Sequence, residues 1–169
     1  MTNFNTDNYT ADSENQTNVF GTTLKTVPAQ ITEDVSELTD GDVFQLCRVS
    51  LDSVVRRIIA PSGVVKHAAA ADNDFGFYKE NADGTLSVLD ADCLIDGADF
   101  TTAMAAKDLL SLNTSLDREL TVREHIAAAL SITKKFDMAL EKVWLCMTMN
   151  TKETTADKLL DLDIVVEYD

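Results

Sequence analysis

The chain has few of the residues on which phosphate loops, disulfide frameworks and metal clusters depend. Its 169 residues include six glycines and three cysteines. No GxGxxG or GxxxxGK[S/T] pattern occurs, so the sequence predicts no glycine-rich loop that cradles phosphate. Cys47, Cys93 and Cys146 lie far apart without a CxxC pair, and with His67 and His125 they do not have zinc-site spacing. We therefore expect free, buried thiols.

Positive charge is also scarce. Fourteen Lys and Arg residues stand against 29 Asp and Glu residues, which gives a net charge of −15. A surface of that sign repels phosphate backbones and anionic lipid. Arg56-Arg57 and Lys134-Lys135 are the only adjacent cation pairs, and neighbours on a strand point to opposite faces. We expect no direct contact with nucleic acid.

Long apolar runs are missing as well. The longest are a handful of residues, whereas a membrane-spanning helix needs about 18 or more. The first residues contain neither a basic segment nor an apolar core of the kind found in signal peptides. We expect one domain in a chain of this length, with no membrane span and no export.

The end of the chain has the clearest structural pattern. Apolar residues occupy alternate positions over Leu160–Tyr168, with acidic residues between several of them. A period of two is typical of an antiparallel strand with one buried face. Val143–Met149 is apolar at nearly every position. It predicts a preceding strand that is covered on both faces.

The middle of the chain predicts more strands, separated by turn residues. Asn81-Ala-Asp-Gly84 is typical of a hairpin turn. Ser50–Ser53 joins the first two strands. The expected strands are Val43–Val49, Val54–Ala60, Phe75–Lys79 and Thr85–Leu89.

Two stretches favour helix. Thr102–Leu112 is rich in strong helix formers. Thr121 and Glu124 have the spacing of a capping box, in which the two side chains satisfy each other's backbone N–H groups. The residues that follow at helical spacing predict one buried stripe. That stripe consists of Val122, Ile126 and Leu130.

This order of elements predicts the fold class. Strands on both sides of a helical stretch exclude a doubly wound parallel sheet. We predict a mainly β (α+β) protein with an antiparallel β-sandwich or jelly-roll-like core and one or two short helices at 102–132. Residues 1–41 are interpreted as a polar N-terminal arm or linker, and residues 42–169 as the sandwich domain.

Four aromatic residues are candidates for contact with a partner. The polar composition of residues 1–19 indicates either a disordered leader or an arm that becomes ordered on a neighbouring subunit, with Phe4, Tyr9 and Phe20 as anchors. Trp144 is on the face opposite Val143. It either packs under a second sheet or a helix, or is an exposed anchor for another subunit.

The acidic segments do not match a metal-binding motif. Asp72–Gly76 offers oxygen ligands, but Phe77 stands where an EF-hand loop requires glycine. A solvated turn is the favoured interpretation, and the same holds for Asp90–Asp92 and Asp96–Asp99. We assign no metal and no cofactor.

No residues are nominated for catalysis. His67 lies among alanines and His125 beside Glu124, and neither belongs to a nucleophile motif. Carboxylates are so numerous that no pair can be singled out as acid and base. We expect a protein that is not an enzyme.

The layout of residues 43–168 resembles a family of tailed-bacteriophage virion proteins with a β-sandwich or jelly-roll-like core. The resemblance lies in the order of short strand-like segments rather than in one long motif. The segments are Arg57-Ile-Ile-Ala60, Asp74-Phe-Gly-Phe-Tyr78, the turn at Gly84, Leu89-Asp-Ala-Asp92-Cys-Leu-Ile-Asp96, Lys142-Val-Trp144 and Val166-Glu-Tyr168.

The resemblance implies a head-associated structural protein. Its members include cement or decoration subunits that bridge major capsid proteins, and the family has no catalytic residues to transfer. It implies a virion location, virion subunits as partners and a homo-oligomer. The 102–135 stretch and the polar arm depart from the family. A neck or tail component, an acidic DNA mimic and a ligand-binding β-sandwich are the alternatives.

Overall fold

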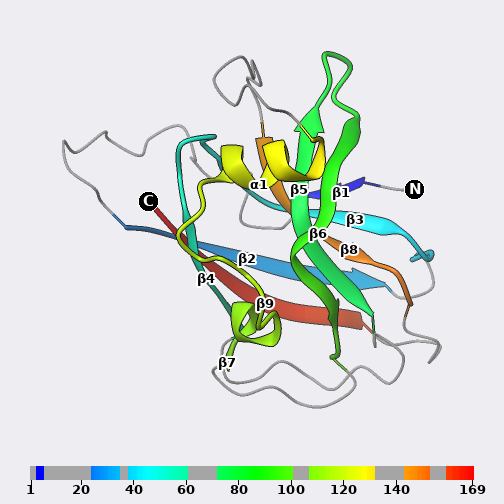
Figure 1. The fold of residues 1–169 in the computed structure, drawn as a ribbon. Coiled ribbons are helices and arrows are strands. Elements are labelled where there is room, and N and C mark those ends of the chain that lie inside the picture. The colour runs from blue at the N-terminus through cyan, green and yellow to red at the C-terminus, as the bar shows by residue number, and fades with distance from the viewer. Residues whose placement is uncertain are drawn as a thin grey trace.

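A computed structural model of the chain describes most of the expected domain (Figure 1). In the part that it describes, no helix is long and apolar enough to cross a membrane. The described residues are 3–5, 24–34, 38–60, 72–100, 107–131, 143–152 and 159–169.

The larger of the two sheets has five strands in the described residues. Their order across the sheet is β1-β3-β8-β5-β6. All neighbours pair antiparallel except β1, which lies parallel to β3. The strands are β1 Asn3–Asn5, β3 Asp42–Val49, β8 Val143–Met149, β5 Asn73–Glu80 and β6 Leu86–Ala98.

The second sheet has four described strands in the order β2-β9-β4-β7, all antiparallel. β9 is central and pairs with β2 over ten residues, from Lys25 opposite Tyr168 to Asp34 opposite Leu159. The strands are β2 Lys25–Asp34, β9 Leu159–Tyr168, β4 Val55–Ala60 and β7 Lys107–Asp108.

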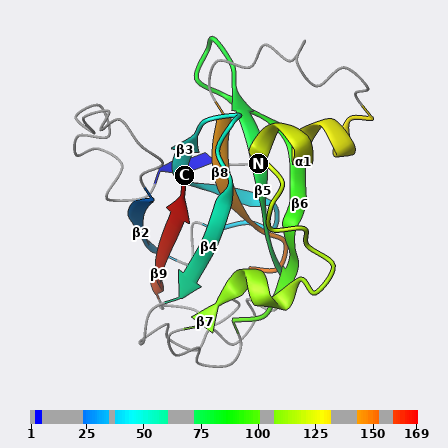
Figure 2. The same ribbon diagram turned by 60° about the vertical axis from the view of Figure 1, so that its left-hand side comes forward.

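The main core lies between the two sheets. Phe44, Phe75 and Leu145 of the larger sheet belong to the same buried cluster as Ile58 and Val166 of the smaller one. The α-helix α1, Val122–Ala129, lies against β6 and adds Val122 and Ile126 to this core (Figures 1 and 2). The fold is therefore mainly β, with two sheets packed as a sandwich, as the sequence predicted.

A capping box starts α1 as the sequence predicts. The Thr121 hydroxyl accepts a hydrogen bond from the Glu124 backbone N–H, and the Glu124 carboxylate accepts one from the Thr121 N–H at 3.0 Å. The backbone N–H groups of Val122 and Arg123 donate to the carbonyls of Ser53 and Leu51, each at 2.8 Å. The bonds from the N–H groups of Thr121, Val122 and Arg123 satisfy donors at the helix start that have no partner within the helix.

The structure differs from the sequence expectations at the start of the domain. Residues 1–41 do not act only as an arm, because Lys25–Asp34 forms β2 of the smaller sheet. The sequence did not predict β2 because most of its residues are polar. The turn at Ser50–Ser53 also joins different sheets, since β3 belongs to the larger sheet and β4 to the smaller.

The expected first helix is wrong where the structure describes it. Lys107–Asp108 forms β7, which pairs with Ile59 and Ala60, and Leu109–Leu112 forms a 3-10 helix. Residues 101–106 lie outside the described residues. In the second helix, Val122 and Ile126 are buried, but Leu130 is the C-cap residue and is 47% exposed.

Candidate functional site

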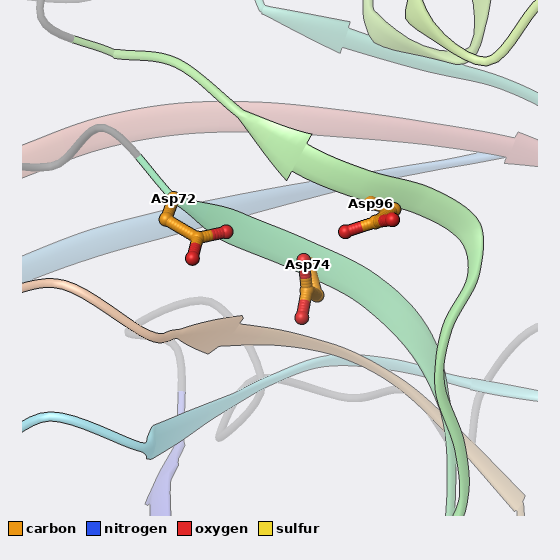
Figure 3. A group of neighbouring side chains, drawn as sticks. All are labelled: Asp72, Asp74 and Asp96. Atoms are coloured by element: carbon orange, nitrogen blue, oxygen red, sulfur yellow. The ribbon is translucent and has the colours of Figure 1, made fainter.

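Three carboxylates converge where β5 begins and β6 ends. Asp72 precedes β5, Asp74 lies in β5 and Asp96 lies in β6, and each contributes an oxygen to a group whose members are within 4.8 Å of one another (Figure 3). Residues 72 and 74 approach Asp96 because Asn73 pairs with Ala98 across the two strands. Within the described residues this is the densest group of potential cation ligands.

Asp74 accepts hydrogen bonds from β6 and from the residue that follows β8. Its side chain accepts from the Gly97 backbone N–H at 2.9 Å and from Asn150 Nδ2 at 2.6 Å. Asn150 Nδ2 also lies 3.4 Å from Asp72 Oδ1, and the Asn150 backbone N–H donates to the Asp72 carbonyl at 2.9 Å. The cluster thus connects the ends of β5, β6 and β8.

The electrostatics of Asp74 follow from its position. Asp74 is only 8% exposed, and this burial raises the pKa of its carboxyl group. The charges of Asp72 and Asp96 raise the pKa further. The hydrogen bonds from Gly97 and Asn150 lower the pKa and partly oppose that rise. These two hydrogen bonds therefore stabilise the charged form of the Asp74 carboxylate.

The cluster could offer three oxygen ligands to a hard cation. Calcium takes six to eight oxygen ligands, so Asp72, Asp74 and Asp96, with one oxygen each, would supply at most half of them. Both Asp74 oxygens already accept hydrogen bonds from protein groups. The geometry shown is that of a hydrogen-bonded connection between strands.

The structure corrects the interpretation of the acidic segments as solvated loops. Asp74 is buried within β5, and Asp90, Asp92 and Asp96 all lie within β6. Sequence reasoning missed Asn150 and Gly97 as partners of Asp74. The one local signal was the i, i+2 spacing of Asp72 and Asp74, which places both on one face of a strand.

A second acidic feature is a bulge in β6 opposite Gly76. The register shifts between Phe75 paired with Ile95 and Phe77 paired with Asp90, so β6 contains extra residues there. A Cβ atom on Gly76 would overlap the backbone of residues 90 and 91. Only glycine fits under the bulge.

The bulge holds Asp90 close to Asp92. Asp90 is half-buried, and burial raises its pKa to about 6, with the hydrogen bond and charge of Asp92 adding to the rise. Backbone N–H groups of Asp92 and Cys93 oppose it. Asp90 therefore titrates closer to neutral pH than an ordinary aspartate.

Trp144 packs rather than serving as an exposed anchor. It is 1% exposed, and its Nε1 donates to Glu80 Oε2 at 2.9 Å. The Arg48 guanidinium lies 5.0 Å from the ring centroid and 3.2 Å from Glu80 Oε2. Trp144 belongs with Val43, Tyr78 and Cys146 to a second buried cluster, on the face of the larger sheet away from the main core.

The structure describes one of the other three candidate anchors. Phe4 lies in β1, whose backbone pairs with that of β3, so Phe4 is opposite Phe44 of its own chain. Tyr9 and Phe20 lie outside the described residues. The described part of residues 1–19 thus pairs with a strand of its own chain.

The three cysteines and His125 pack within the fold. Cys47, Cys93 and Cys146 are free, as expected, and burial raises the pKa of Cys47 to about 12. Cys93 is half-buried rather than buried. The His125 ring lies 6.3 Å from that of Phe77, and burial lowers its pKa. His67 lies outside the described residues.

The chain is a two-sheet, mainly β protein with a strongly acidic sequence. No family model, curated protein or solved structure matches this chain. The functional inference consequently depends on the residues themselves.

Proposed function

We propose that this protein is a structural subunit of a tailed-bacteriophage virion, associated with the head as a cement or decoration protein. The observation that supports this proposal is the agreement between two features. The order of strand-like segments over residues 43–168 resembles such proteins, and the fold has the two-sheet β architecture that the resemblance implies.

The charge of the chain is compatible with this role. A net charge of −15 disfavours contact with packaged nucleic acid and suits a subunit on the outside of a shell. A decoration subunit binds the major capsid protein by surface complementarity, which typically requires about 1,000 Å² of contact or more. The proposed partners are capsid subunits and further copies of this chain.

The proposal is tested on virions. Purified particles from a host that encodes this chain should contain it in many copies by quantitative mass spectrometry. Particles assembled without it should lose DNA at a lower temperature, and adding the purified protein back should restore them. A few copies per particle located at the neck or tail would favour that alternative. Its absence from purified particles would overturn the proposal.

A further inference from the structure

The free edge of β6 is the feature that carries a further inference. β6 is the last strand of the larger sheet, and no described strand pairs with it on the side away from β5. The β5–β6 hairpin projects from that sheet, as Figure 1 shows. α1 packs on the inner face and covers β6 from the core side, while Ser87 and Val88 of β6 are exposed.

The first part of β6 is a regular edge. Glu80 opposite Leu86, Lys79 opposite Ser87 and Tyr78 opposite Val88 follow one register without a shift. The hairpin closes with a hydrogen bond from Asn81 N–H to the Thr85 carbonyl at 2.8 Å. Since hydrogen-bonded and non-hydrogen-bonded pairs alternate, the Val88 N–H and carbonyl point away from β5.

The second part of β6 is less suited to pairing with an added strand. Beyond Val88 the register shifts at the bulge, and Asn113 Nδ2 donates to the Leu94 carbonyl at 3.1 Å. An added strand would therefore pair with residues 86–89, a length comparable to a short natural strand.

One edge of the smaller sheet is protected differently. The strand at this edge, β2, contains Pro28, opposite Val165. Proline has no N–H group, so β2 lacks one donor that an added strand would need. β6 contains no proline.

The side chains around residues 86–89 indicate what could pair there. Val88 is 57% exposed, which offers an apolar contact in the middle of the edge. Asp83 lies in the turn before β6, while Asp90 and Asp92 follow, and β6 itself contains no Lys or Arg. A second copy of β6 would bring like charges together, whereas a basic strand would find opposite charges at both ends.

We propose that residues 86–89 of β6 form a docking edge for an extended segment of another protein, one that has Lys or Arg at its ends and a β-branched residue between them. Main-chain hydrogen bonds to Val88 provide the pairing, and the flanking aspartates select the charge. This mode is strand addition, and it is independent of whether the protein belongs to a virion.

The test uses the full chain and capped heptapeptides of sequence Lys-Thr-Val-Thr-Val-Thr-Lys. A matched peptide has Glu at both ends, and a third has N-methyl groups on alternate residues of the basic sequence. Binding is measured by titration calorimetry, and amide chemical shifts of residues 86–89 report its location. The protein variants are Val88→Pro, which removes the outward N–H, and Val88→Thr, which keeps it.

The basic peptide should bind and shift the amides of residues 86–89. The Val88→Pro variant should bind at least about tenfold more weakly, since a main-chain hydrogen bond contributes roughly that factor, while Val88→Thr should change binding little. N-methylation should have the same effect as Val88→Pro, and it tests the edge even where Val88→Pro does not fold.

Three outcomes would overturn the proposal. One is the absence of binding by the basic peptide up to about 1 mM, the weakest affinity of interest. Another is equal binding by the acidic or the N-methylated peptide. The third is a dimer of the protein alone, seen by sedimentation and abolished by Val88→Pro, because the occupant of the edge would then be a second copy.

Discussion

The two sheets differ in how many of their faces are covered. In the larger sheet every residue of β8 is buried, with Leu145 in the main core and Trp144 in the second cluster behind it. In the smaller sheet β4 has buried and exposed residues side by side, and Ile58 is buried while Arg57 is exposed. A strand with two covered faces has no side that tolerates loss of apolar volume, whereas a strand with one covered face does.

The largest effects are expected for neighbouring residues of β8. Leu145→Ala should lower the free energy of unfolding by about 2–5 kcal/mol and Trp144→Ala by about 3–5 kcal/mol, because each removes a large side chain from a filled site. Urea denaturation followed by circular dichroism measures both. A change for Trp144→Ala within about 0.5 kcal/mol, the range of a surface substitution, would show that the second cluster does not stabilise the sheet.

The close contact at Gly76 should make the larger sheet sensitive to a single added carbon. Gly76→Ala places a Cβ atom against the backbone of β6, and relief requires the bulge to move, at a cost of about 3 kcal/mol. Gly84→Ala is the control. Its Cβ would meet open space, but φ is +82°, so about 1 kcal/mol is expected. Equal losses in thermal denaturation would contradict the close approach.

In the smaller sheet only one of two neighbouring residues should matter. Val166 is buried in the main core, so Val166→Ala should cost about 1.5–2 kcal/mol. Glu167 is partly exposed and lies 3.9 Å from the exposed Arg57, so Glu167→Ala should change stability by about 0.5 kcal/mol or less. Similar losses by urea denaturation would mean that both faces of β9 are covered, as in β8.

The smallest effect is a pH dependence at the bulge. Burial and Asp92 raise the pKa of Asp90 from its usual 3.8 to about 6 in the folded protein. The folded state therefore holds this proton more tightly, so the contribution of Asp90 to stability increases as pH falls from 7 through 6 towards 4. Because solvent screens a half-buried carboxylate, the gain is on the order of 1 kcal/mol.

The variant Asp90→Asn isolates that contribution. The difference in unfolding free energy between the natural chain and the variant, measured at each pH, removes the effects of carboxylates that do not interact with Asp90 and reports the Asp90–Asp92 pair. The natural chain should gain stability relative to the variant between pH 7 and pH 4. A difference that stays constant over this range would place the Asp90 pKa near its ordinary value.

The sequence predicted the elements whose signals are local. Alternation identified β9 and capping identified α1, while the Asn81–Gly84 turn identified the β5–β6 hairpin. The nearly continuous apolar run of β8 also indicated that both faces are covered. Each of these signals depends on residues close together in the chain.

The missed features depend on tertiary pairing. β2 is a polar edge strand that is stabilised by its ten-residue register with β9, which no local pattern reveals. Asp90–Asp92 resembled a turn, because the bulge that holds it depends on the backbone of β5 approaching at Gly76. The contact of Asp96 with Asp74 likewise requires the β5–β6 register.

The central position of β9 has a consequence for the order of folding. β9 separates β2 from β4, so until residues 159–168 have been synthesised β2 has no partner in the smaller sheet and β4 can pair only with the two residues of β7. β2 pairs across more than a hundred intervening residues, and such contacts form slowly because the connecting loop must close first. During translation the β5–β6 hairpin can form early. The smaller sheet can be completed only when β9 is available, and until then its apolar face is open to chaperones or to aggregation.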